Sequence, residues 1–166
     1  NHFARIVAKG YSQKEGVDYF ETWAPTARLS TARTILHLAA AQNLEIEAMD
    51  VDQAFLQGDL QEAIYMRPPP ACTGMDTDKN VVWELKKPLY GLKQAPRQWH
   101  EKLKGVLTDL GFSRSLADPS LFLKRSSTKC WMLVYVDDFL LMAEKKEDLD
   151  TLKALLKGRF PMKDLG

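Results

Sequence analysis

The segment Met132–Ala143, MLVYVDDFLLMA, places two adjacent aspartates inside an otherwise apolar stretch. A carboxylate in apolar surroundings costs several kcal/mol unless a partner neutralises it. Asp137 and Asp138 also repel each other, by about 4 kcal/mol at contact for an effective dielectric constant of roughly 20. A fold that contains this segment must therefore supply a compensating cation, and this requirement limits what the chain can form.

The flanks of the aspartate pair predict a β-hairpin. Apolar, strand-forming residues stand on both sides, which indicates two strands joined by a two-residue turn at Asp137 and Asp138. Asp tolerates the positive φ angles of such turns, so the pair could simply form the turn. Two like charges are a poor choice for a turn alone, however. A divalent cation would remove their repulsion, and Mg²⁺ prefers one or two carboxylates together with substrate phosphates.

A third carboxylate would complete a two-metal site. The stretch AMDVDQAF offers Asp50, at the end of a predicted strand between the apolar residues Met49 and Val51. Asp52 points to the same face, because side chains alternate along a strand with a period of two. The pattern alone leaves both aspartates as candidates.

Strand and helix patterns alternate along the chain, which predicts a mixed α+β fold. The first helix is expected to start at an N-cap, Ser30, and to close at Asn43. Strands are expected over residues 3–13, 45–48, 63–70, 81–87, 119–125, 130–136 and 139–144, and helices over 31–43, 96–110 and 147–160, with a polar loop at 71–80 and a turn at 126–129.

Length and composition indicate a globular chain. Its 166 residues suffice for one domain or two intimate subdomains, and 45% are hydrophobic. No apolar run reaches the ~18 residues of a membrane span, so no membrane association is expected. Cys72 and Cys130 lack metal-ligand spacing and indicate a reducing compartment. The first residue is Asn1, and the chain is expected to be a piece of a longer protein.

Charge is segregated although the net charge is only +1. Residues 43–62 hold six acidic and no basic side chains, whereas residues 83–104 hold six basic and two acidic ones. Such segregation suits either two solvated faces or a cation site opposite a phosphate-binding surface. Lys93, Gln94 and Arg97 stand at the start of a predicted helix, where donors and the helix dipole favour anions.

Four blocks resemble the reverse transcriptase of copia-type LTR retrotransposons. They are ARIVAKGYSQKEGVDYFETWAPTARLSTARTIL, MDVDQAFLQGDLQEAIYMRPPP, LKKPLYGLKQAPRQW and LVYVDDFLLMAE, and they follow the family's order and spacing over nearly the whole chain. The resemblance implies a right-hand polymerase fold. Fingers are expected at about 1–44 and 58–95, and the palm at about 45–57 and 96–166. The palm would be a mixed or antiparallel, ferredoxin-like sheet with helices on one face, and the thumb and ribonuclease H would be absent.

The resemblance also assigns roles to individual residues. It favours Asp50 over Asp52 and leaves Asp52 accessory. It makes Phe55 the aromatic residue that excludes a 2′-hydroxyl, although a core aromatic is the alternative. The implied catalytic residues are Asp50, Asp137 and Asp138, which bind metal together with Val51; the nucleotide-binding residues are Phe55, Ala54, Gln94, Arg5 and Lys9; and the nucleic-acid-binding residues are Lys86, Lys87, Lys93, Arg97 and Tyr135.

The implied function is RNA-directed DNA polymerisation by two-metal transfer to a primer 3′-hydroxyl. The cofactors would be two Mg²⁺ ions, with Mn²⁺ as a possible substitute. Template-primer, dNTPs and the rest of a Pol polyprotein, including ribonuclease H and integrase, would be the partners, in cytoplasmic virus-like particles. The alternative is an inactive element remnant that only binds nucleic acid. A generic Mg²⁺-dependent nuclease or phosphatase is disfavoured, because such sites rarely use an adjacent carboxylate pair on a hairpin tip and the sequence indicates no activating histidine or lysine.

Overall fold

The computed structural model describes residues 5–69, 81–125 and 129–166. The chain divides into two compact units. The hairpin unit consists of residues 1–23 and 55–102, and the sheet unit of residues 24–54 and 103–166. The expected loop at 71–80 with Cys72, and most of the expected turn at 126–129, lie outside the described residues. No helix in the described part of the chain is long and apolar enough to cross a membrane.

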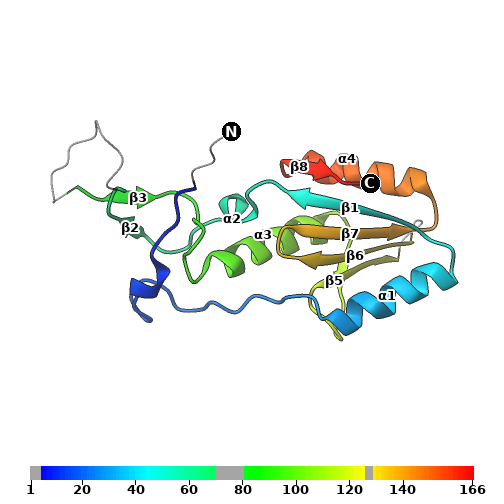
Figure 1. The fold of residues 1–166 in the computed structure, drawn as a ribbon, viewed down its shortest axis with the longest axis horizontal. Coiled ribbons are helices and arrows are strands. Elements are labelled where there is room, and N and C mark those ends of the chain that lie inside the picture. Colours follow the sequence, from blue (N-terminus) through cyan, green and yellow to red (C-terminus); the bar gives the residue numbers. More distant parts are fainter. Residues whose placement is uncertain (1–4, 70–80, 126–128) are drawn as a thin grey trace. The chain divides into compact units, whose positions relative to one another are not determined.

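The sheet unit is built on six antiparallel strands (Figure 1). β1 lies between β7 and β8, although β7 follows it by more than eighty residues in the chain. In spatial order the strands are β4 (Ser113–Arg114), β5 (Leu121–Arg125), β6 (Lys129–Tyr135), β7 (Asp138–Ala143), β1 (Glu45–Val51) and β8 (Met162–Asp164). The α+β class is confirmed.

Helices cover both faces of this sheet. α1 (Leu29–Ala41) packs Ile35 and Ala39 on Leu133 and Met142. α4 (Lys146–Lys157) contacts β7 and β1, and its lysines reach Glu47. Glu47 lies on the opposite face from Met142, because neighbouring residues of a strand alternate in direction. The expectation of helices on one face is therefore wrong. Both faces of the central strands are apolar, and both need a cover.

The start of α1 also differs from expectation. The helix begins at Leu29, and Arg28 rather than Ser30 is its N-cap residue. The buried Asp118 replaces a local cap: its carboxylate accepts the backbone N–H groups of Arg28 (3.1 Å) and Ser120 (2.9 Å). Burial alone would raise the pKa of Asp118, but hydrogen bonds from Thr31, Ser120 and Arg28 outweigh it and lower that pKa. Asp118, which is distant in the sequence, thus supplies the hydrogen-bond acceptor that the residues at the start of α1 lack.

The hairpin unit holds a two-stranded sheet of β2 (Ile64–Met66) and β3 (Trp83–Leu85). The strand expected over 3–13 is absent from its described residues, where Gly10–Ser12 forms the 3₁₀ helix η1. α2 (Ala54–Gln57) and α3 (Ala95–Asp109) each continue from one unit into the other. The sequence did not predict α2, β4 or β8, because each is shorter than a recognisable hydrophobic period.

Two glycines explain why residues 5–12 run beside another loop instead of forming a strand. The Ala8 N–H donates to the Tyr90 carbonyl at 2.8 Å. A Cβ added at Gly10 would lie 1.8 Å from the Gly91 carbonyl oxygen. Gly91 has φ +95°, and a Cβ there would lie 2.1 Å from the Ala8 oxygen. The two backbones are therefore in direct contact, which no larger residue permits at either position.

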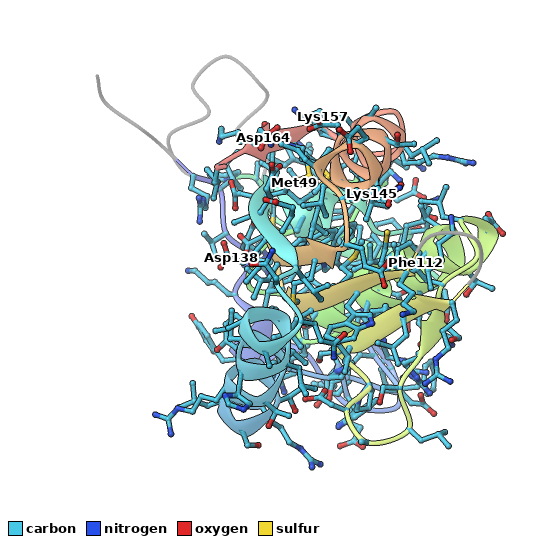
Figure 2. The ribbon with its side chains drawn as sticks, turned by 90° about the vertical axis from the view of Figure 1, so that its right-hand side faces the viewer. Met49, Phe112, Asp138, Lys145, Lys157 and Asp164 are labelled. Atoms are coloured by element: carbon cyan, nitrogen blue, oxygen red, sulfur yellow. The ribbon has the colours of Figure 1, made fainter. Side chains whose placement is uncertain are left out.

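An ion-pair network centred on the buried residues Glu47 and Lys153 joins β1, α4 and β8. Glu47 is only 7% exposed and pairs with Lys146 and Lys153. Lys153 also lies 3.1 Å from Asp164, which pairs with Lys157 at the same distance; Figure 2 shows Asp164 and Lys157 together. The hydrogen bond from Lys146, followed by that from Lys153, lowers the pKa of Glu47. Lys153 likewise lowers the pKa of Asp164 to about 2.

We expect Glu47→Gln to lower the free energy of unfolding by about 2 kcal/mol, because Lys153 would lose its buried partner but keep Asp164. Urea unfolding followed by circular dichroism measures this. Glu144→Gln is the matched control, since Glu144 pairs with Lys129 in solvent and such pairs contribute less than about 1 kcal/mol. Equal effects of both substitutions would contradict the prediction.

Candidate active site

The β6–β7 hairpin turns one residue earlier than the sequence indicated. Tyr135 pairs with Asp138, so the turn residues are Val136 and Asp137, and the expected turn at Asp137–Asp138 is wrong. Val136 has φ +60°, whereas φ of Asp137 is not positive. Asp138 is therefore the first residue of β7. Its side chain takes the direction that the strand dictates rather than that of a turn.

Asp138 and Asp50 are direct cross-strand partners. β1 pairs Asp50 with Asp138 of β7 on one side and with Lys163 of β8 on the other. With Tyr135 of β6 opposite Asp138, these residues form one row across four strands, which we call the Asp50 row. Residues directly opposite in antiparallel strands share a face, with Cβ atoms about 4.5–5.5 Å apart. The row therefore presents two carboxylates beside each other on one face.

The charges of this row are not balanced. Asp138 is exposed, yet neighbouring protein atoms displace part of its water, and this desolvation raises the pKa of its carboxyl group. The negative charges of Asp137 and then Asp50 raise that pKa further. Both neighbouring aspartates thus act on the Asp138 carboxylate. A cation placed among them would be strongly attracted.

The backbone ties the turn to the end of β1. The N–H of the buried Val51 donates to the Asp137 carbonyl at 2.9 Å. Two residues near these aspartates have left-handed backbone conformations: Gln53 has φ +53° and Val136 has φ +60°. A β-branched residue such as Val136 rarely adopts this region. Such strain persists only where surrounding contacts enforce it, and it is common at functional sites.

The aspartates offer oxygen ligands of the kind that Mg²⁺ binds. Within the described residues, however, no group of three His, Cys, Asp or Glu side chains is close enough to hold a metal ion. Two carboxylates in register, with a third in the adjoining turn, fit a cation in donor type and in charge. They would have to move together to coordinate it.

Lys163 is a charged neighbour that the sequence did not reveal. Its Nζ lies 2.5 Å from Asp52 Oδ1 and 3.9 Å from Asp50 Oδ2. The ion pair with Asp52 raises the pKa of Lys163. β8 is only three residues long, so no period marked it as a strand beside β1. The only available signal was a lysine next to the apolar residue Met162.

In the hairpin unit, Gln94 is fully buried rather than open to a ligand. Its Oε1 accepts a hydrogen bond from Gln13 Nε2 (3.0 Å), and its Nε2 donates to the Asp18 carbonyl (2.9 Å). Gln13 Oε1 in turn accepts the Lys93 backbone N–H at 2.8 Å. The side chain of Gln94 therefore holds the 13–18 loop against the start of α3.

Phe55 packs inside the hairpin unit. Its ring centroid lies 4.6 Å from that of Tyr90, and the cluster around it includes Leu92 and Ala95. The guanidinium of Arg5 lies over the ring of Tyr90, 4.8 Å from the ring centroid. These contacts support a packing role for Phe55 and Arg5. In the sheet unit, Ala54 is fully buried.

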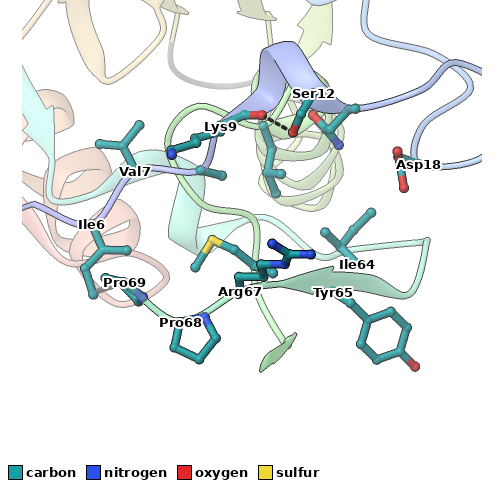
Figure 3. Close-up of a pocket in the computed structure, with 14 residues that line it drawn as sticks. Ile6, Val7, Lys9, Ser12, Asp18, Ile64, Tyr65, Arg67, Pro68 and Pro69 are labelled. Carbon is teal, nitrogen blue, oxygen red and sulfur yellow. Dashed lines mark hydrogen bonds between the residues drawn. The ribbon is translucent and has the colours of Figure 1, made fainter. Parts of the chain in front are cut away.

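A cavity of about 620 Å³ opens between two segments of the hairpin unit, as Figure 3 shows. Residues 6–13 form one wall and residues 64–69 the other, with Asp18 and Leu92 completing the lining. Lys9 and Arg67 bring positive charge to a lining that is otherwise mostly apolar. Lys9 is the one predicted nucleotide-binding residue that the structure places at this cavity.

The predicted nucleic-acid-binding side chains are engaged in surface pairs. Lys86 contacts Glu84 at 2.6 Å and Lys87 contacts Asp59 at 2.8 Å. Arg97 pairs with Glu21, and Lys93 Nζ lies 3.1 Å from the Tyr19 hydroxyl. Tyr135 belongs to the other unit, where it is exposed at the end of the Asp50 row. Exposed pairs of this kind are weak and can exchange for phosphates.

Comparison with known proteins identifies the family. The family described as "Reverse transcriptase (RNA-dependent DNA polymerase)" matches residues 1–166. The chain therefore belongs to the reverse transcriptase family, and the resemblance seen in the sequence is confirmed. No solved structure matches the chain significantly.

Several relatives are Pol polyproteins of transposons. The "Retrovirus-related Pol polyprotein from transposon TNT 1-94" of Nicotiana tabacum is 43% identical over 98% of this chain. That from transposon RE1 of Arabidopsis thaliana is 43% identical over 97% of it, and the "Transposon Ty1-NL2 Gag-Pol polyprotein" of Saccharomyces cerevisiae is 33% identical over 92%. The chain spans only 12%, 11% and 9% of these proteins.

We expect Asp138→Asn to stabilise the metal-free protein by less than about 1 kcal/mol, because it removes a solvent-screened repulsion. A carboxyl group whose pKa is raised by folding destabilises the fold while it is charged. The gain in thermal midpoint should therefore be present at pH 7 and vanish below the ordinary Asp pKa of 3.8. Scanning calorimetry in EDTA, with the exposed Asp109→Asn as control, measures it. A lower midpoint at pH 7 would contradict the prediction.

Proposed function

We propose that this chain forms part of an RNA-directed DNA polymerase that adds deoxynucleotides to a primer 3′-hydroxyl. Family membership supports the reaction class. The observation that carries the proposal is the register of the Asp50 row, which sets Asp50 directly opposite Asp138 with Asp137 in the adjoining turn. Like charges are brought together here at a cost to the fold, which is expected where a cation is to be bound.

In this proposal Asp50, Asp137 and Asp138, with the Val51 carbonyl, hold two Mg²⁺ ions, for which Mn²⁺ can substitute. Such ions would supply Lewis-acid activation of the attacking hydroxyl and stabilisation of the charge on the phosphate. The chain itself contributes position. The Val51–Asp137 hydrogen bond holds the turn, and the β1–β7 pairing sets the backbones of the other two aspartates opposite each other.

The hairpin unit would bind the incoming nucleotide. Lys9 at the cavity and Arg5 are proposed to bind the triphosphate. Phe55 is proposed to limit space at the sugar, beside Ala54. Gln94 would act by holding the loop around Gln13, because both polar ends of its side chain are already engaged by protein partners.

Template and primer would be held by phosphate contacts of Lys86, Lys87, Lys93 and Arg97 and by Tyr135 near the primer end. Phosphates would replace the surface carboxylates that now pair with three of these side chains, so binding should weaken steeply with salt. The fingers are proposed at about 1–44 and 58–95 and the palm at about 45–57 and 96–166. In the structure α1 belongs to the same compact unit as the palm strands.

A second candidate function is nucleic-acid binding by a polymerase remnant without activity. The absence of a gathered group of three ligands among the described residues is the observation in its favour. In the active proposal, the rest of a Pol polyprotein supplies a thumb, ribonuclease H and integrase, and residues 1–166 alone extend primers negligibly. Its setting would be a cytoplasmic virus-like particle.

We expect Asp138→Asn to reduce primer extension by at least about 10³-fold in the polymerase region that includes the thumb, since it removes a charge that the reaction needs. Incorporation of labelled dTTP on poly(rA)·oligo(dT) with Mg²⁺ measures this. Asp109→Asn, an exposed aspartate on α3, is the control and should keep wild-type activity. Equal activity of the two variants would contradict the catalytic role of Asp138. An inactive wild type that still binds the duplex would favour the second candidate.

Replacing Phe55 with Val should relax discrimination against ribonucleotides about ten-fold, because a smaller side chain admits the 2′-hydroxyl. A ten-fold change fits the loss of one pocket contact, which is worth about 1–3 kcal/mol. The ratio of rNTP to dNTP incorporation is the readout. Leu60→Val, in the same cluster, controls for loosened packing. If both variants change the ratio equally, or neither does, Phe55 is only a core residue.

A further inference from the structure

Lys163 extends the Asp50 row on the side away from Asp138. Its ammonium lies between Asp52 at 2.5 Å and Asp50 at 3.9 Å. We propose that Lys163 is a positioning residue that occupies the place of a cation in the metal-free site, and that it must withdraw before Asp50 can bind metal. This inference rests on the proposed function of the Asp50 row.

The backbone around Lys163 is fixed by strand pairing, whereas its side chain is largely exposed. β8 pairs with β1 at Met162–Val51 and Lys163–Asp50, and the Asp52 N–H donates to the Pro161 carbonyl at 2.9 Å. The Lys163 side chain is 63% exposed, so its ammonium can leave the carboxylates for water without opening the core. Lysine suits this role, since it is a point charge on a flexible stem.

This arrangement accounts for the absence of a gathered ligand group among the described residues. Lys163 draws Asp50 toward β8, whereas a shared metal would draw it toward Asp138 on β7. The two states therefore compete for one carboxylate. The arrangement also gives a role to Asp52, which anchors Lys163 beside Asp50 without being needed as a metal ligand.

Competition between a lysine and a divalent ion predicts a measurable effect on affinity. Binding the ion requires the Lys163 ammonium to give up its contacts with Asp52 and Asp50, and its positive charge still repels the ion from the surrounding water. Removing the charge should therefore tighten Mn²⁺ binding about ten-fold. An arginine at the same position keeps the charge and should leave the affinity near that of the wild type.

The test is a titration of residues 1–166 with Mn²⁺, followed by the loss of the free-ion electron paramagnetic resonance signal. Lys163→Gln should bind about ten-fold more tightly, while Lys163→Arg and the control Lys157→Gln should stay within about two-fold of the wild type. Lys157 is a suitable control because it is also a lysine paired with an aspartate of β8, Asp164, but it belongs to the α4 network rather than to the Asp50 row. Circular dichroism verifies that each variant is folded.

Unchanged or weaker binding by folded Lys163→Gln would overturn the inference, and so would tighter binding by Lys157→Gln. Adding Asp50→Asn to Lys163→Gln separates this failure from that of the proposed function. If the double variant loses the ion, Asp50 is a ligand, and the outcome concerns Lys163 alone. If Mn²⁺ binds equally with and without the Asp50 carboxylate, or if Lys163→Gln binds none, both proposals fail.

Discussion

The pairing of β1 between β7 and β8 is the constraint on which the rest of the sheet unit depends. It sets Asp50 opposite Asp138 and Lys163 on one face, and it turns Glu47 toward α4 on the other. Each face carries charge that neighbouring strands or helices must balance. On the α4 side the balance is complete, with lysines around Glu47. On the other side it is not, and this difference separates a structural network from a candidate catalytic one.

The sequence predicted the elements that are long enough to show a clear hydrophobic period. The central strands and the three long helices have enough residues for a clear period, and the aspartate pair required a cation whatever the fold. The family blocks then identified Asp50, which alternation alone could not distinguish from Asp52. Family membership is confirmed, whereas the individual catalytic and binding assignments remain proposals.

The features that the sequence missed depend on contacts between distant residues. Nothing near Leu29 shows that Asp118 would cap α1, and nothing near Gly10 shows that Gly91 would press against it. The β6–β7 turn lies one residue before the predicted position, because Val136 adopts a backbone conformation that is unfavourable for its β-branched side chain. Lys163 was overlooked because a three-residue strand carries no pattern. Tertiary contacts decided each of these cases.

The alternation along β1 also limits how the gene can change in length. Loss or gain of one residue between Glu45 and Asp50 would turn every later side chain of the strand to the opposite face. The carboxylate of Asp50 would then point at α4, and an apolar residue would face Asp138. Substitutions in this strand can be graded in their effect, but a single-codon insertion or deletion would exchange the two faces at once.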